Sequence, residues 1–315
     1  MPELPDIELY REVLTRRVVG GTLDRVRVKG PFLVRSFDPP IDEAVGRQVR
    51  EIRRLGKRLV FAFEGELFFV LHLMIAGRLL YKPPGAVPTG KIDLAALEFG
   101  GAAPVPGTLV ITEAGTKHRA SLHVVQGEAA LAAHDPGGLD VFAASDAAFV
   151  AALRRDNRTL KRALAEPQRF SGIGNAYSDE ILWEAGMSPI TLTGRLSDED
   201  AARLAQAARR TLEMWTRALL GEFGVIGTKP GRFPKAGDIT AFRPDFAVHG
   251  KFGQACPRCG HLVQRIVHAE NETNYCPVCQ TGGRVLADRS LSRLLKEDWP
   301  RTPEEWEMGR GPARG

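Results

Sequence analysis

Apolar residues recur at helical spacing near the start of the chain. A proline at position 5 suits the first turn of a helix, and two consecutive glycines after Val19 favour its end. The pattern therefore predicts an amphipathic helix over Pro5–Val19. The apolar face of this helix consists of Ile7, Tyr10, Leu14 and Val18.

From Thr22 to about Gln126 the pattern changes to short runs of β-branched and aromatic residues. Glycine and proline clusters, such as the one at 82–85, separate these runs. Many short strands with turn signals between them predict a sandwich or a barrel. The clearest runs cover residues 59–63, 67–71, 108–112 and 121–125.

Helical spacing returns after a linker predicted at Ala132–Gly138. Ser145 is expected to cap a helix whose apolar positions continue to Leu164. Ser197 opens a capping signature that predicts a longer helix, ended by Gly221. Together with the strands before them, these helices predict a multidomain α+β chain.

Two further segments interrupt the helical part. The glycine-containing stretch Ser171–Asn175 is expected to open a shorter helix that stops at Gly186. Residues 221–244 are rich in glycine and proline and predict a mobile loop. The chain shows no internal repeat.

Length and composition are those of a globular protein with two or three domains. The chain has 315 residues, of which 43% are hydrophobic and 26% charged. It has no apolar run long enough to span a bilayer and no signal-like start, so we expect a cytoplasmic protein. The net charge of +5 modestly favours a polyanionic partner.

The four cysteines form two C-x-x-C pairs with sixteen residues between them. This spacing predicts a Cys₄ zinc site, and iron or a redox dithiol are the alternatives. Between Lys251 and Lys296, seven basic residues stand against three acidic ones. That excess favours DNA contact over a ribbon that only packs against a neighbour. The expected ligands are Cys256, Cys259, Cys276 and Cys279.

The chain starts Met1-Pro2-Glu3. If Met1 is removed, Pro2 becomes a secondary amine, and a neutral amine can attack a sugar C1′ to form an iminium (Schiff base) intermediate. Glu3 is placed to shuttle protons to the opening ring. The alternative is structural, since proline is common near helix starts.

In this order, the opening Pro2–Asp6, the segment Gly172–Tyr177 and the final Cys₄ finger resemble the formamidopyrimidine-DNA glycosylase and endonuclease VIII family. The resemblance runs from Met1 to about Gln280. Leu4, together with the segment Val248–Lys251, is more similar to the formamidopyrimidine branch.

The resemblance implies an N-terminal β-sandwich with a leading helix, a helix–two-turn–helix module and a zinc finger. It also implies a bifunctional glycosylase and AP lyase that removes oxidised bases from double-stranded DNA, as a monomer with one structural zinc. The expected domains are 1–131, 140–244 with a lesion-capping loop at 224–238, 245–282, and an extension at 283–315.

By matching to the family, Pro2 is the expected nucleophile and Glu3 the general acid/base. Lys57 matches a phosphate-binding lysine, and Asn175 an asparagine that holds the lesion's phosphate at a helix N-terminus. Lys161 matches a lysine near the same backbone. The alternatives are a solvated strand lysine for Lys57 and a helix cap for Asn175.

The chain departs from the family pattern on the finger. Asn271 stands where the family has an arginine that clamps phosphate, and Glu270 and Glu272 are expected to repel phosphate. A short helical stretch at 291–296 extends beyond the usual family length.

Other departures lie on the DNA-probing loops. Met74 or Ile75 replaces the family's methionine wedge. Lys117 and Arg119, with His118 between them, stand in for an Arg-Arg-Phe triplet, and Lys251 is a further candidate for DNA contact.

Two other functions remain open from the sequence. One is a non-catalytic protein that binds damaged or abasic DNA on the same scaffold, which the loss of the finger arginine favours. The other is a zinc-ribbon adaptor for nucleic acid, in which the N-terminal half serves only as a scaffold.

Overall fold

The computed structural model describes residues 1–268, 271–286 and 301–305. The chain forms two compact units. The first contains Met1–Gly137 and Glu213–Ala241, and the second contains Gly138–Leu212 and the chain from Phe242 onward. The boundary after Gly137 falls within the predicted linker. The helical stretch expected at 291–296 lies outside the described residues.

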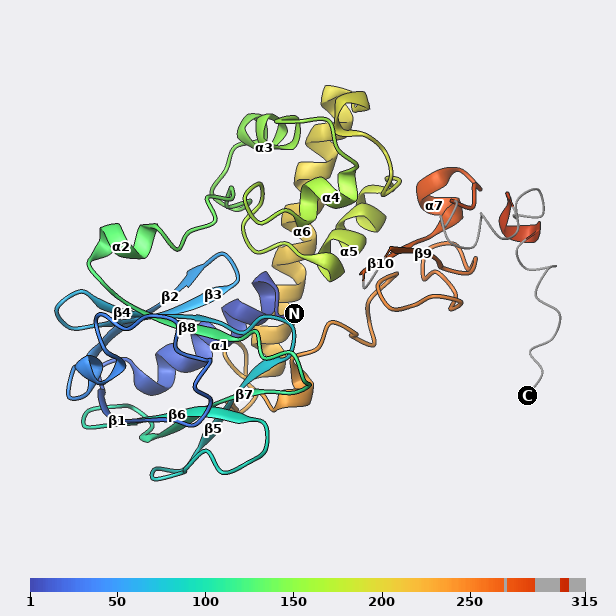
Figure 1. Cartoon of the computed structure of the whole chain (residues 1–315). Helices are drawn as coiled ribbons and strands as arrows, with labels where there is room; N and C mark the ends of the chain where they lie inside the picture. The colour runs from blue at the N-terminus through green and yellow to red at the C-terminus, as the bar shows by residue number, and fades with distance from the viewer. Residues whose placement is uncertain (269–270, 287–300, 306–315) are drawn as a thin grey trace, which may run out of the picture. The chain divides into compact units, whose positions relative to one another are not determined.

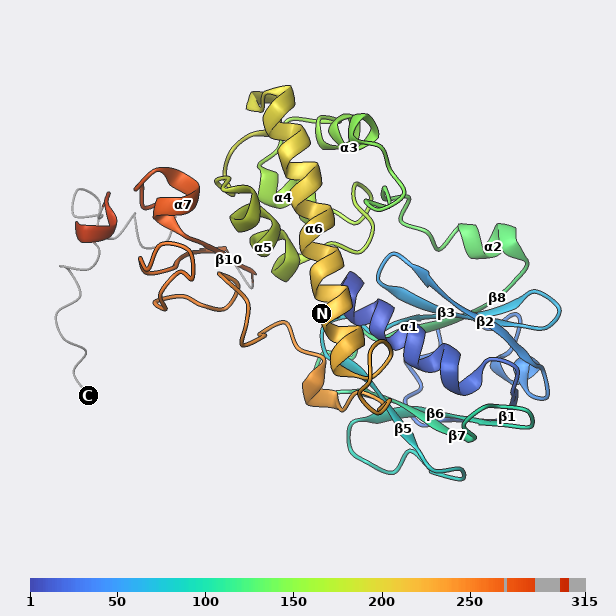
Figure 2. The ribbon, with the colours of Figure 1, turned by 180° about the vertical axis from the view of Figure 1, so that it is seen from behind.

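In the first unit, helix α1 (Leu4–Val18) lies between two four-stranded antiparallel sheets (Figures 1 and 2). One sheet has the order β1-β6-β7-β5, with β1 (Thr22–Val28), β6 (Asp93–Gly100), β7 (Gly107–Glu113) and β5 (Gly77–Lys82). The other has the order β2-β3-β4-β8, with β2 (Val49–Leu55), β3 (Arg58–Phe63), β4 (Leu67–His72) and β8 (Ser121–Gln126). The predicted helix and sandwich are confirmed.

Strands β3 and β4 are apolar at every position except Arg58 and His72, and the apolar side chains on both of their faces are buried. Alternate residues of β3, such as Leu59 and Phe61, join the main core with α1. The residues between them, Val60 and Ala62, join a second cluster with Leu131 of the short helix α2 (Glu128–Ala132). Because successive side chains of a strand point to opposite faces of the sheet, each of these strands contributes to two separate hydrophobic clusters.

Within the described residues, the second unit contains a group of helices followed by the finger. The helices are α3 (Asp146–Leu153), α4 (Leu160–Ala165), α5 (Asn175–Ala185) and the first part of α6 (Asp198–Glu222). The finger contains β9 (Gln264–His268), β10 (Asn271–Tyr275) and α7 (Pro277–Thr281). Helix α6 continues past Leu212 into the first unit, where Leu219 and Phe223 join the main core.

Helix ends in the second unit follow the predicted capping signals. The Ser145 hydroxyl accepts from the Ala148 N–H at 3.2 Å, and the Ser197 hydroxyl accepts from the Asp200 N–H at 3.0 Å. Gly186 ends α5 with a φ of +65°, where glycine is favoured. The helix expected from Ser145 onward is in fact two helices, α3 and α4. Within the described residues, no helix is long and apolar enough to cross a membrane.

Candidate functional site

The amino terminus lies beside the start of α1, inside the first unit. Pro2 is buried, and Glu3 and Asp6 are each 3% exposed. The Glu3 N–H donates to Asp6 Oδ2 at 3.0 Å, which fixes the first turn. Burial lowers the pKa of the Met1 amino group, the terminus of the full chain, from its ordinary value of 8.0, although the Glu3 carboxylate opposes this shift. A lower pKa leaves more of the amine neutral and therefore nucleophilic.

Four charged side chains act on the amino terminus. Glu3 and Asp6 raise its pKa, whereas Arg78 and Lys57 lower it. Because Coulomb interactions weaken with distance, all four must lie around this amine. The first unit therefore places the buried carboxylate of Glu3 and two cations, Lys57 and Arg78, near the amino terminus. That combination suits nucleophilic attack assisted by proton transfer.

Lys57 lies in the turn between β2 and β3 and is 7% exposed. Arg54 holds this turn, since its Nε donates to Glu8 of α1 at 2.6 Å and its Nη1 to the Gly56 carbonyl at 3.3 Å. Gly56 has a φ of +62°, a conformation that glycine adopts without strain. The turn thus fixes Lys57 relative to α1.

The turn between β4 and β5 exposes Ile75, which is 56% accessible. The Gly77 N–H donates to the Leu73 carbonyl at 2.9 Å, and a Cβ on Gly77 would lie 2.2 Å from that oxygen. The turn therefore requires glycine at this position. Met74 is half-buried with a φ of +51°. Of the two wedge candidates, Ile75 is the more exposed.

The loop between β7 and β8 carries Lys117, His118 and Arg119, all of them exposed. Its base is shaped by Glu113, which is 1% exposed and accepts from the N–H groups of Arg119 at 2.9 Å and Ala120 at 3.2 Å. A buried carboxylate is stable here because backbone donors satisfy it. Glu113 therefore holds the base of the loop that carries Lys117 and Arg119.

The segment 232–238 is attached to the first unit. The Phe233 ring lies 6.0 Å from the Tyr10 ring and 5.6 Å from the Tyr81 ring, measured between centroids. Arg232 Nη1 donates to Asp238 Oδ2 at 2.6 Å. This part of the predicted loop has its own aromatic anchor and ion pair.

In the second unit, Asn175 is the first residue of α5. The N-cap position is Gly174, so the alternative that Asn175 serves as the cap is wrong. The half-buried Asn175 side chain donates through Nδ2 to the Glu272 carbonyl of β10 at 3.0 Å. The N-terminus of a helix also carries free N–H groups and a positive dipole, which suit an anion.

Lys161 lies on α4 and is 8% exposed. Its Nζ donates to Asp179 Oδ1 at 2.6 Å and to the Asn175 carbonyl at 2.5 Å. The lysine expected near the DNA backbone is therefore paired with an internal carboxylate. The structure thus brings Lys161 and Asn175 together.

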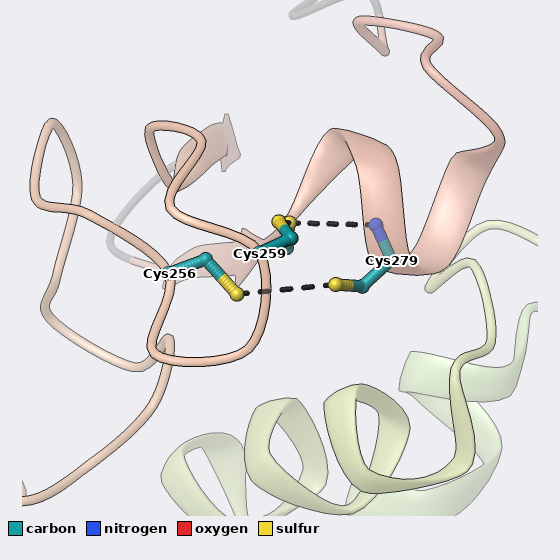
Figure 3. Close-up of side chains that lie close together, drawn as sticks. Cys256, Cys259 and Cys279 are labelled. Carbon is teal, nitrogen blue, oxygen red and sulfur yellow. Dashed lines mark hydrogen bonds between the residues drawn. The ribbon is translucent and has the colours of Figure 1, made fainter.

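The four cysteines converge on one point, and their sulfur atoms all lie within 4.8 Å of one another. Figure 3 labels three of them, Cys256, Cys259 and Cys279. Cys256 Sγ lies 3.9 Å from Cys279 Sγ, and Cys259 Sγ lies 3.4 Å from Cys276 Sγ. Thiolates bound to tetrahedral zinc at about 2.3 Å lie about 3.8 Å apart. The donor set therefore fits one structural zinc ion, and the predicted ligands are confirmed.

Two neighbouring residues of the finger hairpin lie on opposite faces of it. Asn271 and Glu272 are adjacent in β10, so their side chains point to opposite faces of the hairpin. Glu272 also pairs with Arg265 Nη1 at 3.1 Å, which offsets its charge. Glu270 lies outside the described residues. Near the finger, Lys251 Nζ donates to the Pro244 carbonyl at 2.6 Å.

Sequence reasoning missed the buried carboxylates of α5. Asp179 is fully buried, and Glu180 is 4% exposed and accepts from three consecutive N–H groups, those of residues 247–249, at 2.8–2.9 Å. Burial raises the pKa of Glu180. Two adjacent acids, flanked in α5 by Tyr177 on one side and by Ile181 and Leu182 on the other, were the available signal.

Three family models match this chain. They are the formamidopyrimidine-DNA glycosylase N-terminal domain at residues 1–106, its H2TH domain at 138–220, and the zinc finger found in FPG and IleRS at 253–282. The described fold, with its paired sheets, helical region and Cys₄ cluster, agrees with these three matches.

Whole relatives also match. The formamidopyrimidine-DNA glycosylase of Laribacter hongkongensis is 31% identical over 289 residues, which cover 89% of this chain and 100% of that protein. A formamidopyrimidine-DNA glycosylase of Thermus thermophilus is 32% identical over 286 residues, covering 90% of this chain and 100% of that protein.

Solved structures give the same result. A complex of Lactococcus lactis Fpg with DNA containing an abasic site has a TM-score of 0.74 at 26% identity, covering 89% of this chain and 99% of that one. MutM in complex with DNA containing carbocyclic 8-oxo-G has a TM-score of 0.73 at 25% identity, covering 89% and 100%. The chain belongs to the formamidopyrimidine-DNA glycosylase family.

Proposed function

We propose that this protein is a bifunctional DNA glycosylase and AP lyase that removes oxidised bases from double-stranded DNA in base-excision repair. The observation that carries the proposal is the amino terminus. Pro2 is buried there beside Glu3, and burial also lowers the pKa of the Met1 amino group that precedes it, on which Glu3, Asp6, Arg78 and Lys57 act electrostatically. Family membership, with relatives named formamidopyrimidine-DNA glycosylase, supports the same activity.

The reaction follows from these groups. With Met1 removed, the Pro2 nitrogen attacks C1′ of a nucleotide turned out of the duplex, because C1′ cannot be reached within the base stack. The base leaves as the N–C1′ bond forms, and Glu3 transfers a proton as the sugar ring opens. Loss of a C2′ proton from the iminium then expels the 3′ phosphate and cleaves the strand.

Phosphate contacts are assigned to residues of both units. Lys57 and Asn175 serve as backbone contacts, supported by the fixed turn of Lys57 and by the anion-suited start of α5. Lys161 contributes beside Asn175, and Lys251 beside the finger. Among family structures, Fpg is seen bound to DNA with an abasic site.

Other residues act at the displaced base or on the strand opposite it. Ile75, with Met74 beside it, fills the gap that the displaced base leaves, since an exposed apolar side chain can enter a base step. Lys117 and Arg119 contact phosphates of the opposite strand. The loop at 224–238 caps the displaced base.

The decisive experiment is borohydride trapping on a duplex that contains an abasic site. Processed protein that starts at Pro2, verified by intact mass, should give a covalent adduct. The matched control keeps one extra residue before Pro2, which turns the amine into an amide and leaves the rest of the chain unchanged. Absence of an adduct with the processed protein, beside an active family enzyme, would refute the proposal.

A second candidate is a non-catalytic protein that binds abasic or damaged DNA. Asn271 favours it, since an amide cannot replace the charge and the two-pronged hydrogen bonding of a guanidinium. Tight binding to abasic duplex without an adduct or strand cleavage would support this candidate. The adaptor hypothesis is less favoured, because residues 1–106 match the family's own N-terminal domain.

A further inference from the structure

The charge of Asp179 is buried in the second unit and has no part in the proposed chemistry. Its side chain is fully buried, yet three segments supply it with donors. Lys161 Nζ of α4 lies at 2.6 Å, His249 Nδ1 at 2.7 Å, and the Asn274 N–H of β10 at 3.1 Å. A buried carboxylate needs such partners, and a set drawn from three segments makes Asp179 a junction between them.

Strand β10 pairs with β9 along one edge only. In an antiparallel strand, the N–H and C=O groups of one residue point to the same edge, and successive residues alternate. Glu272 and Asn274 both direct these groups away from β9. Helix α5 meets them, since Asn175 Nδ2 donates to the Glu272 carbonyl at 3.0 Å and Asp179 accepts from the Asn274 N–H.

The two contacts match in spacing. Asn175 and Asp179 are one helical turn apart and share a face of α5, whereas Glu272 and Asn274 share an edge of β10. Lys161 links the two α5 residues, because its Nζ donates both to Asp179 and to the Asn175 carbonyl. The Asn175 amide is therefore oriented by the finger hairpin and not by α5 alone.

The predicted zinc site lies next to this contact in the chain. Cys276 follows the last residue of β10, and zinc ligation stabilises the folded hairpin. Loss of the metal would free β10, and with it the partners of Asn175 and Asp179. This coupling needs no contact between the zinc and DNA.

We propose that Asp179 is a positioning residue that locks the zinc hairpin to Asn175, so that zinc occupancy sets the orientation of the phosphate-binding amide. The DNA-binding half of this inference rests on the proposed function. The locking of the hairpin to α5 does not.

The test compares Asp179→Ala with Asp156→Ala. Asp156 also pairs with a buried cation of the same unit, Arg169, at 2.5 Å, and its other ion-pair partner is Arg158 at 2.8 Å. We expect Asp179→Ala to release zinc to a colorimetric chelator at least tenfold faster, and to bind a duplex with a tetrahydrofuran abasic site about tenfold more weakly. Asp156→Ala should change neither property.

A double-mutant comparison tests the link to Asn175. Asn175→Ala should weaken binding to the abasic duplex. The double variant Asn175→Ala/Asp179→Ala should bind no more weakly than the weaker-binding single variant, because both substitutions disrupt the same contact between α5 and β10. Additive losses, or unchanged zinc release in Asp179→Ala, would overturn the proposal.

One measurement needs no variant and no DNA. In the wild-type protein with zinc, the backbone N–H of Asn274 should exchange with solvent as slowly as the backbone N–H groups of α5. After the metal is removed, it should exchange at least a hundredfold faster. Fast exchange with zinc bound would overturn the inference even if Asp179→Ala fails to fold. Borohydride trapping of the wild type decides the proposed function separately.

Discussion

At the scale of single residues, burial decides the chemistry of the first unit. Glu3 and Asp6 are both nearly inaccessible, and the Asp6 carboxylate fixes the helix start by accepting from the Glu3 N–H. Glu3 lies next to the proposed nucleophile and acts on the terminal amine. Its position follows from the chain, since residue 3 cannot be far from residue 2, but its burial depends on the fold.

Glu3→Gln should lower base excision at least a hundredfold, because the amide cannot transfer a proton. Affinity for a duplex with an abasic analogue should stay within about threefold. Single-turnover excision and fluorescence anisotropy measure the two properties. Excision at the wild-type rate would contradict the role assigned to Glu3.

His72 gives a prediction about pH. Burial, together with the charges of Arg58 and Lys57, lowers its pKa from 6.5 to about 4. Between these values the unfolded chain binds a proton that the folded protein does not, so stability falls as the pH drops from 6.5 towards 4. The loss is at most about 3.5 kcal/mol, at about 1.4 kcal/mol per pKa unit.

His72→Gln should remove this part of the pH dependence. Urea unfolding at pH 4.5 and at pH 7 measures it, with His118→Gln, at an exposed histidine of the same unit, as the control. Equal pH dependence in the wild type and His72→Gln would show that the histidine does not titrate as described.

At the scale of elements, the sequence located most helices and strands because their apolar periods differ. Strands β3 and β4 were found as continuous apolar runs, and α5 was bounded by its glycines. The break between α3 and α4 was missed, because Leu160 continues the apolar pattern of Leu153. Contacts between elements, such as that of Asn274 with Asp179, have no local signal.

The attachment of the segment 232–238 is a testable feature of one element. Phe233→Ala should destabilise the first unit by about 2 kcal/mol, below the range for a fully buried aromatic, because Phe233 is only partly buried. It should lower base excision more than cleavage at a preformed abasic site, which has no base to cap. Phe37→Ala is the control, since Phe37 is 91% exposed.

Urea unfolding and the two cleavage assays measure the effects of Phe233→Ala. If both cleavage reactions decline equally, the segment serves stability alone and does not cap the base.

At the scale of the whole molecule, the two compact units should respond differently to the metal. Zinc removal should lower the thermal midpoint of the second unit, because a small Cys₄ finger depends on its metal. The first unit should keep its transition. Differential scanning calorimetry with and without a chelator measures this, and a shift of both transitions by the same amount would contradict it.

The basic charge of the molecule gives a last prediction. Each phosphate contact contributes about 0.9 to the slope of log affinity against log salt concentration. Lys117→Ala and Arg119→Ala should each lower the slope by about this amount. Lys161→Met should also weaken binding but lower the slope by less, since the ion pair with Asp179 already offsets part of the Lys161 charge. Anisotropy titrations from about 50 to 200 mM salt test this, and an equal loss of slope in all three variants would contradict the assignment.

The sequence by itself determined what depends on local order: the apolar periods of α1 and the strands, the glycine and serine helix ends, the C-x-x-C spacing, and the Pro2-Glu3 start. These features act over a few residues, so neighbours along the chain reveal them. Tertiary structure decided the rest, because burial and pairing join distant segments. It lowered the pKa of the amino terminus, placed Glu272 beside Arg265, and closed Lys161, Asp179, His249 and Asn274 into one buried junction.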